Sequence, residues 1–582
     1  MKTMKYLLVM LCVLSAVSGF GQTVRYVKTN GTTTAENAAN ATSWATACAD
    51  LQAVINASDE GDEIWVAAGT YKPNRPANSL NTIDETNRNN AFVLKKDVKV
   101  YGSFVGTETT LEERQLPEAG DYNYITILSG DFLDNDDATL ASKSENAYHI
   151  VISVGDAGTA RFDGFTITGG NSNGTSYVLV NSQQIHQYFG GGMYNNNSSL
   201  AYANINVYKN EAKNVGGGIY NCSSSNSNFL NVNISGNGAN IQGGGMANVE
   251  SSPTLADVNI VENGVVNNGG GIWNSASSPI LTNVTISGNE AFSGGGIYNI
   301  DSSPVLTDVI ICKNKTGAGS GDAGGGMYNN ASSPKLTNVS IYENSTTAGY
   351  GGGIYNTNAS SPILTNVVIT ENSSQRGGGI CNVKKSSPIL TAVKIHKNTA
   401  TSGAGISNDD SSPILNDVSI NENVAQTNGG GMYNINNSVS KLTDVIIDGN
   451  TACAAGGYSQ GSGGGIYNNY SSLVLVNVII SRNGAKQYNG GGGGIYNYGD
   501  VPVLMTNVSI TKNTSSNFGG GIYNDGLSSL TMHGGSIDET NQAFTGSGIL
   551  NVSTDFYLDG DVNIKNLYLS PKTTPFNFSI FQ

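Results

Sequence analysis

Charged side chains are scarce in this chain of 582 residues. The 29 lysines and arginines and the 44 aspartates and glutamates make up 13% of the chain, about half the usual share. The formal net charge is −15. Because this sign repels phosphate backbones and anionic lipid surfaces, we expect no nucleic-acid partner and no binding to an anionic membrane surface.

Cysteine and histidine are also rare, with 6 and 4 residues. The four histidines lie far apart, so no zinc spacing and no nucleophile triad emerges. An odd number of scattered cysteines follows the N-terminal segment, and we predict that they are free structural thiols rather than a disulfide framework. They are Cys48, Cys222, Cys312, Cys381 and Cys453.

Long apolar runs are absent beyond the first residues. Lys2 and Lys5 precede an apolar stretch over 6–17, and small residues at Gly19 and Gly21 fit cleavage before Gln22. This pattern predicts a signal peptide over 1–21 and no transmembrane segment after cleavage. We therefore expect a protein that is secreted or associated with the cell surface or outer membrane.

What the chain has in excess is glycine, with 75 residues, and it comes in repeats. One half-repeat reads G-G-G-[I/M]-Y-N and recurs about fourteen times at a commonest step of about 26 residues. A clean copy spans Gly294 to Asn299. A solenoid in which each repeat packs only on its neighbours explains how so long a chain avoids a single oversized core.

The other half-repeat reads S-S-P-x-L-x-x-V-x-I-x-x-N, as in Ser277 to Asn289. Val284 and Ile286 alternate as in a strand with one buried face, whereas Leu281 is out of phase, so we expect a bend at 282–283. A leucine-rich repeat shares this pattern, but it places a helical segment after the strand. Three consecutive glycines would cost such a helix about 3 kcal/mol, which favours a second strand.

These patterns predict an all-β fold, a single-stranded right-handed parallel β-helix with a short N-terminal helical cap. About fourteen coils at about 4.8 Å give a rod of roughly 65 Å. Asn289 and Asn299 recur at two corners of each coil, where stacked amides can bond one another along the axis. Our predicted divisions are the cap and first irregular coils over 22–160, regular repeats over 161–555 and a closing segment over 556–582.

The irregular segments have separate predictions. We expect one amphipathic cap helix over 43–57 and a first strand beginning at 62–66. The polar stretches 71–90 and 106–124 are predicted loops, and 174–189 is a predicted insertion.

With these motifs in hand, the chain resembles the pectate-lyase-like β-helix superfamily. It is most similar to secreted bacterial proteins with chlamydial polymorphic-membrane-protein-type repeats, which carry G-G-A-[I/L/V] and F-x-x-N. Here Gly-Gly-Gly-Ile/Met replaces the first motif, and Ile286 to Asn289 and Ile341 to Asn344 replace the second. The resemblance covers about two-thirds of the chain. It implies a β-helix at the cell surface or outside the cell, with an adhesion or scaffold role.

Enzymes on this fold need clustered carboxylates. A lyase needs Ca²⁺ and a base, and a glycoside hydrolase needs a carboxylate pair. The repeats show no such group on adjacent coils, so we favour a non-catalytic protein and keep a polysaccharide lyase or glycoside hydrolase as the alternative. The densest acidic group offers hard oxygen ligands for Ca²⁺, the one cofactor that the sequence suggests. It consists of Asp131, Asp134, Asp136 and Asp137.

An aromatic residue follows the inward Ile or Met of most G-G-G repeats. Strand alternation points it outward, which predicts an aromatic stripe along one face. The stripe either stacks on itself or contacts a ligand, a glycan or a host or cell-surface protein. The ligand-contact candidates are Trp273, Tyr298, Tyr328 and Tyr355.

Overall fold

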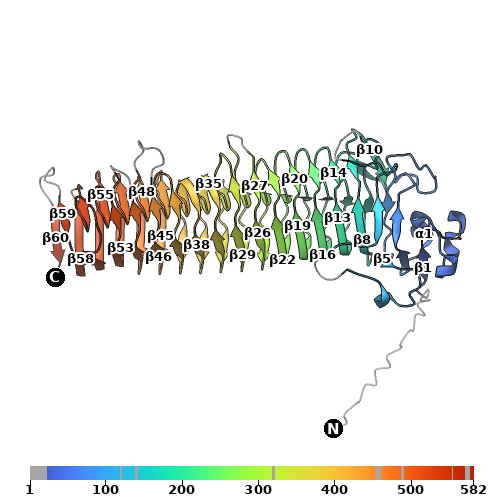
Figure 1. Ribbon diagram of the computed structural model, residues 1–582, viewed down its shortest axis with the longest axis horizontal. Helices are drawn as coiled ribbons and strands as arrows, with labels where there is room; N and C mark the ends of the chain where they lie inside the picture. Colours follow the sequence, from blue (N-terminus) through green and yellow to red (C-terminus); the bar gives the residue numbers. More distant parts are fainter. Residues whose placement is uncertain are drawn as a thin grey trace, which may run out of the picture.

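The computed structural model describes residues 22–117, 121–137, 142–317, 321–453, 461–486, 490–553, 555–569 and 577–581. The predicted signal peptide over 1–21 lies outside these ranges. The described chain forms a straight rod of stacked coils, with the irregular N-terminal part at one end (Figure 1). The predicted all-β parallel β-helix is confirmed. No described helix is long and apolar enough to cross a membrane.

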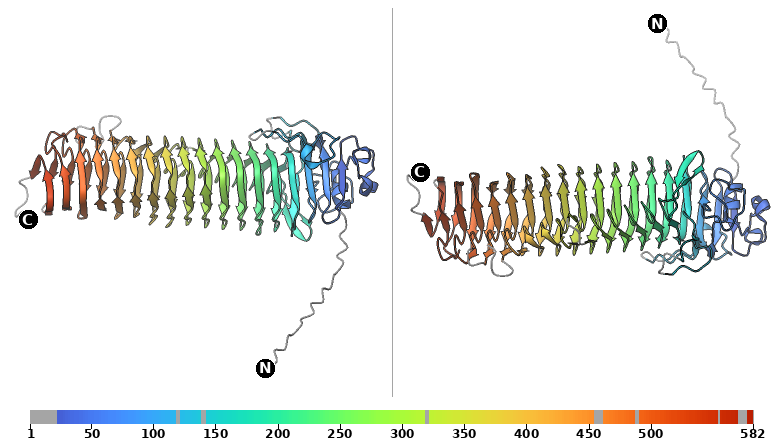
Figure 2. Two further views of the ribbon diagram at one scale, coloured as in Figure 1. Left: turned by 90° about the horizontal axis from the view of Figure 1, so that it is seen from below. Right: turned by 90° about the horizontal axis from the view of Figure 1, so that it is seen from above.

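The coils build three parallel sheets that run along the rod, and the third of them begins at residue 171 (Figure 2). The Tyr sheet is built from the I-Y-N segments, and its neighbouring strands pair in register, as Ile297 does with Met327. Its strands are β4 (Phe92–Val93), β7 (Val151–Val154), β12 (Met193–Asn196), β15 (Ile219–Cys222), β18 (Met246–Val249), β21 (Ile272–Ser275), β24 (Ile297–Ile300), β28 (Met327–Asn330), β32 (Ile354–Thr357), β36 (Ile380–Val383), β40 (Ile406–Asp409), β44 (Met432–Ile435), β48 (Ile466–Asn469), β52 (Ile495–Tyr498), β55 (Ile522–Asp525), β57 (Ile549–Asn551) and β59 (Leu567–Leu569).

The long-strand sheet is built from the L-x-x-V-x-I segments. Its strands are β1 (Val24–Val27), β2 (Glu63–Ala67), β3 (Gly69–Tyr71), β5 (Lys99–Phe104), β6 (Thr126–Ser129), β8 (Arg161–Thr168), β13 (Ala201–Tyr208), β16 (Asn228–Ser235), β19 (Thr254–Val261), β22 (Ile280–Ser287), β25 (Val305–Thr307), β26 (Ile310–Cys312), β29 (Lys335–Thr337), β30 (Ser340–Tyr342), β33 (Ile363–Thr365), β34 (Val368–Thr370), β37 (Ile389–Thr391), β38 (Lys394–His396), β41 (Ile414–Asn416), β42 (Ser419–Asn421), β45 (Val439–Thr443), β46 (Ile446–Asp448), β49 (Ser472–Val476), β50 (Ile479–Ser481), β53 (Pro502–Thr511), β56 (Ser529–Ile537), β58 (Asp555–Ile564) and β60 (Asn577–Phe581).

The short-strand sheet follows the corner asparagine of each coil, and most of its strands have two residues. They are β9 (Asn171–Ser172), β14 (Glu211–Ala212), β17 (Gly238–Ala239), β20 (Gly264–Val265), β23 (Glu290–Ala291), β27 (Lys315–Thr316), β31 (Ser345–Thr346), β35 (Ser373–Arg376), β39 (Thr399–Ser402), β43 (Val424–Ala425), β47 (Thr451–Ala452), β51 (Gly484–Ala485) and β54 (Thr514–Ser515).

The bend predicted in the long-strand sheet is present in every regular coil that carries the pattern. Asn283 has φ 54°, and its equivalent Asp308 has φ 55°. Asparagine and aspartate tolerate this left-handed conformation better than other non-glycine residues. The bend allows Leu281 to join Val284 and Ile286 in the core, where each is at most 1% exposed.

Two columns of buried asparagines connect successive coils through side-chain hydrogen bonds. In the Tyr sheet, Asn299 Nδ2 donates to Asn329 Oδ1 at 2.9 Å, and equivalent bonds connect the column from Asn195 to Asn551. At the corner, Asn314 Nδ2 donates to Asn344 Oδ1 at 3.0 Å, within a column that ends at Asn541. Both asparagine ladders predicted from the repeat are therefore formed.

The N-terminal end differs from its predicted form. The segment 43–57 is not one helix, because it divides into the 3₁₀ turn η2 (Trp44–Thr46) and helix α1 (Leu51–Ala57), each with its own side-chain cap from Ser43 and Asp50. A further 3₁₀ helix, η1 (Ala35–Asn40), precedes them. The first strand is β1, which pairs in parallel with β2, so the stack begins before the strand at 62–66.

The interruptions lie where polar segments predicted loops. The insertion 174–189 contains an antiparallel hairpin of β10 (Tyr177–Val180) and β11 (Gln183–His186). The segment 106–124 contains the 3₁₀ turn η3 (Leu111–Glu113). At the far end, β58 pairs in parallel with β56 and β59 with β57, so regular stacking extends beyond residue 556.

Candidate functional site

A carboxylate cluster lies at the side of the early coils, in the segment between β6 and β7. Asp131, Asp136 and Glu145 each offer an oxygen, and these oxygens lie within 4.8 Å of one another. Asn146 Nδ2 donates to Asp136 Oδ2 at 2.9 Å and also to the carbonyl oxygen of Gly169 at 2.8 Å. The loop is thus tied to the corner of the next coil, which brings carboxylates that are 14 residues apart in sequence into one group.

Only two of the four aspartates predicted as metal ligands belong to this cluster. Asp134 instead forms an ion pair with Lys72 at 2.6 Å, and its side chain is 75% exposed. Asp137 accepts a hydrogen bond from Ser142 Oγ at 2.7 Å. Glu145, which the sequence pattern missed, supplies the third carboxylate, and its Oε1 is buried without a hydrogen-bond partner among the described residues.

The electrostatics of the cluster disfavour three unshielded charges. Burial, together with the negative charge of Asp131, raises the pKa of Asp136, and the hydrogen bond from Asn146 opposes this shift. The cluster opens into a cleft of about 510 Å³ that Lys143, Lys209 and Glu211 also line. Lys143 forms an ion pair with Glu211. A bound cation would relieve the repulsion, and carboxylate oxygens are the ligands that Ca²⁺ prefers.

We therefore expect Ca²⁺ to stabilise the early coils by about 2–3 kcal/mol at a concentration near 100 times its Kd. Thermal unfolding with and without Ca²⁺ measures this, and the D136N/E145Q double variant should lose the shift. Binding should weaken on acidification, because protons compete for a carboxyl whose pKa is raised. The matched control is Asp134→Asn, which lies outside the cluster; an equal loss of the Ca²⁺ effect in this variant would contradict the assignment.

The aromatic residues of the Tyr sheet form two stacked runs. The rings of Tyr298 and Tyr328 are 4.5 Å apart with an angle of 10° between planes, and those of Tyr467 and Tyr496 are 5.0 Å apart at 4°. Tyr355 continues the first run, 5.1 Å from Tyr328. Ring stacking of this kind adds to the packing between coils.

The stripe is less exposed than strand alternation predicts. Trp273 is 8% exposed and packs in a cluster with Tyr220, whereas Tyr298, Tyr328 and Tyr355 are partly buried. Burial raises the pKa of Tyr355 to about 12. The reason is the tight turn before each strand, where glycines at positive φ bring the preceding segment against the rings, as between Phe189 and Tyr220 at 4.9 Å.

The two runs are separated where Cys381 and Ser407 replace the aromatic residue. Arg376 fills this gap. Its guanidinium lies 5.7 Å from the ring centre of Tyr350 and 5.5 Å from that of Tyr433, and it pairs with Asp409 at 3.4 Å. Arg376 thus packs between the two aromatic runs and joins them. This packing favours self-stacking as the main role of the aromatic stripe.

Residues 507–525 match the Chlamydia polymorphic membrane protein repeat. The resemblance to such repeats predicted from the motifs is confirmed by this match. Among solved structures, a crystal structure of the pectate lyase Pel9A is similar to this chain at 13% sequence identity and a TM-score of 0.37, over 62% of this chain and 78% of that chain. No curated protein matches.

Sequence reasoning missed the surfaces that arise only from stacking. The cluster at Glu145 depends on a loop that returns to the corner of the next coil, and no spacing rule encodes that return. A shallow groove across the short strands depends on small residues at equivalent places in consecutive coils. The signal for that groove was present, because Gly238, Gly264, Ala239 and Ala291 occupy the positions after the corner asparagines.

Proposed function

We propose that this chain is an exported, non-catalytic β-helix rod at the cell surface or outside the cell, where it serves as an adhesion or scaffold module. The observation that carries the proposal is the unbroken asparagine column from Asn195 to Asn551, which makes the regular coils a uniform stack. A uniform stack supplies length and stiffness, and its surface is regular rather than organised around one reaction centre. The Chlamydia polymorphic membrane protein repeat match supports a surface location.

The test is expression of the full chain with a C-terminal tag in a diderm bacterium, followed by cell fractionation and mass spectrometry of the mature N-terminus. We expect the protein in the outer-membrane or medium fraction with Gln22 at its N-terminus. Accumulation of uncleaved chain in the cytoplasm would contradict export. Incubation with a panel of polysaccharides should release no new reducing ends and no unsaturated products.

A polysaccharide-acting enzyme is the second candidate, and one observation favours it. Asp131, Asp136, Lys143 and Glu211 line one cleft on the early coils, and a lyase or hydrolase needs carboxylates and a base in such a place. Turnover of any polysaccharide that disappears in the D131N/D136N variant, but persists in Asp134→Asn, would establish this alternative over the non-catalytic role.

A further inference from the structure

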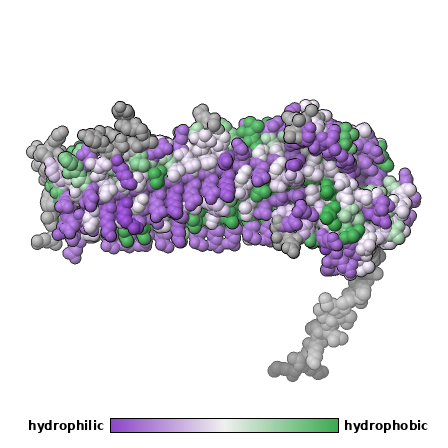
Figure 3. Space-filling view, in the orientation of Figure 1, coloured by the Kyte–Doolittle hydropathy of each residue, from purple (hydrophilic) through white to green (hydrophobic). Residues whose placement is uncertain are grey.

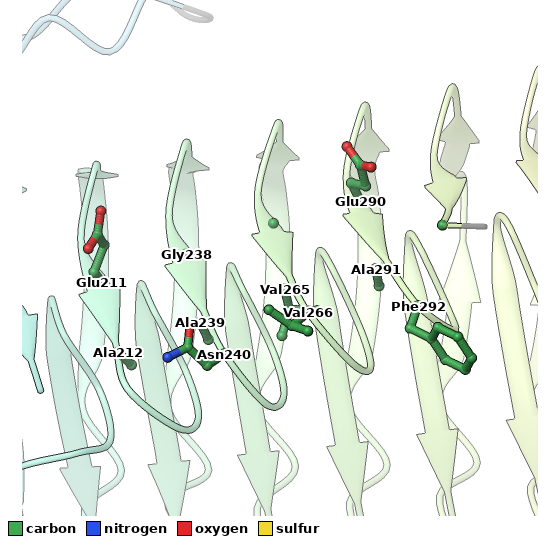
Figure 4. A pocket seen from close by; sticks show the side chains of 12 residues that line it. Glu211, Ala212, Gly238, Ala239, Asn240, Val265, Val266, Glu290, Ala291 and Phe292 are labelled. Atoms are coloured by element: carbon green, nitrogen blue, oxygen red, sulfur yellow. The ribbon is translucent and has the colours of Figure 1, made fainter. Parts of the chain in front are cut away.

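A second groove crosses the short-strand sheet and shares Glu211 with the cleft beside the carboxylate cluster. It has a volume of about 540 Å³ and spans β14, β17, β20 and β23. Figure 4 shows Glu211 and Glu290 projecting from equivalent positions at either end of the span, with Val266 and Phe292 on the segments that follow the strands. We call this feature the short-strand groove.

The floor of the groove is low because its residues are small. Ala212, Ala239 and Ala291 are 3–7% exposed and form a small cluster of their own with Val265. Gly264 has no side chain, and a Cβ added there would have no atom within 4 Å. The groove is therefore open above the short strands, whose small residues form its bottom.

Apolar groups are exposed in this groove. Val266 is 65% exposed and Phe292 is 38% exposed, although residues at the neighbouring core positions are nearly fully buried. The space-filling view places apolar and polar residues side by side over the early coils (Figure 3). An exposed ring beside an aliphatic side chain offers a surface on which the apolar face of a flat ligand can rest.

The local charge of the groove is balanced. Glu211 forms an ion pair with Lys143, and Glu290 lies beside Lys315 in the next strand of the ladder. The groove therefore exerts little net attraction on a polyanion or a polycation, and a neutral ligand fits it best. The carboxylates and the Asn240 amide remain available as hydrogen-bonding groups for hydroxyls at the rim.

The direction of the groove selects a linear polymer. It runs along the rod axis across four coils, which at about 4.8 Å per coil amounts to a span of roughly 14 Å. The strands of its floor are already paired on both sides, as β17 is with β14 and β20, so a peptide cannot add there as a further strand. A polymer with apolar faces and many hydroxyls uses both the ring and the polar rim.

We propose that the short-strand groove binds a linear neutral glycan along the rod axis. This inference goes beyond the proposed surface role, since a rod can be exported and non-catalytic without this site. The ring of Phe292 stacks on a sugar face, Val266 contacts the adjoining apolar edge, and Glu290 accepts hydrogen bonds from hydroxyls.

The test is calorimetric titration of the full chain with neutral hexasaccharides, namely a β-1,4-glucan, a β-1,3-glucan and a β-1,4-mannan. We expect at least one to bind, and Gly264→Trp, which fills the open floor, to weaken that binding at least about tenfold. Phe292→Ala should also weaken it. Thr282→Trp is the matched control, because it adds the same side chain to an exposed position of the long-strand sheet close by in sequence.

Several results would overturn the proposal. They are no binding of any of the three hexasaccharides, equal binding by wild type and Gly264→Trp, or tighter binding of hexagalacturonate or oligolysine than of the neutral chains. A Tyr298, Tyr328 and Tyr355 triple phenylalanine variant keeps the ring stack and removes the hydroxyls. If that variant loses binding while Gly264→Trp binds as the wild type does, the glycan site lies on the Tyr sheet. Export and turnover are measured separately, so failure here leaves the proposed surface role intact.

Discussion

Replacement of Asn314 by alanine is expected to lower the free energy of unfolding of the surrounding coils by roughly 3–6 kcal/mol. Asn314 is fully buried. Its Oδ1 accepts from the backbone N–H and from Nδ2 of Asn289, both within 3.0 Å, and its Nδ2 donates to the carbonyl oxygen of Ile286 and to Asn344. Alanine leaves both donors of Asn289 without this acceptor in a place that water cannot reach.

Hydrogen exchange measured by mass spectrometry tests this prediction coil by coil, because a solenoid need not unfold in one step. Protection should fall most in the coils of Asn289 and Asn344. Asn299→Ala should cost less, since its side chain has one amide partner on each side. The control is Asn366→Gly, at an exposed bend with φ 54°, where glycine suits the backbone. Equal effects at 314 and 366 would contradict the assigned role of the buried column.

Gly296→Ala is expected to destabilise the stack by roughly 2–4 kcal/mol. A Cβ at this position would lie 2.6 Å from the backbone oxygen of Gly326 in the next coil and 3.1 Å from Asn314 Nδ2. Neither neighbour can move freely, since one is backbone and the other is held in the asparagine column. Chemical denaturation followed by circular dichroism gives the change in the transition midpoint.

The same substitution is expected to cost no stability at another glycine. Gly264→Ala should be neutral or slightly stabilising, because its Cβ would meet open space and alanine restricts the unfolded chain. Comparison of the two variants distinguishes a steric requirement for glycine between coils from a general effect of alanine on stability. If Gly296→Ala unfolds at the same denaturant concentration as Gly264→Ala, close approach of the coils does not explain the G-G-G motif.

The repeat was readable from the sequence because it is local chemistry repeated at a fixed step. The alternation of Val284 and Ile286, the offset of Leu281 and the recurring Asn289 together predict a strand, a bend and a stacked corner, and each is present. The burial of the aromatic stripe could not be predicted from the sequence, because it depends on how the segment before each strand packs over the rings. Alternation tells only which side of a strand a residue faces.

The irregular front end was harder to predict for a related reason. The separation of η2 from α1 depends on two caps seven residues apart, Ser43 and Asp50, within a segment whose apolar spacing fits one helix. Likewise, Asp134 and Asp136 are equivalent in sequence terms, yet Lys72 engages one and the cluster holds the other. Contacts with distant segments of the chain determine these local structures and partners.

The asparagine columns have a direction, because every amide–amide bond in them runs from Nδ2 of one coil to Oδ1 of the following coil. In the Tyr sheet, other groups complete the column at both ends. Tyr202 Oη donates to the first acceptor, Asn195, at 2.5 Å, and the last donor, Asn551, bonds to the carbonyl oxygen of Ser553 at 2.8 Å. A whole coil could therefore be duplicated or deleted between these termini without leaving an amide unmatched. Such a molecule can change its reach by recombination of single repeats while its two ends stay intact.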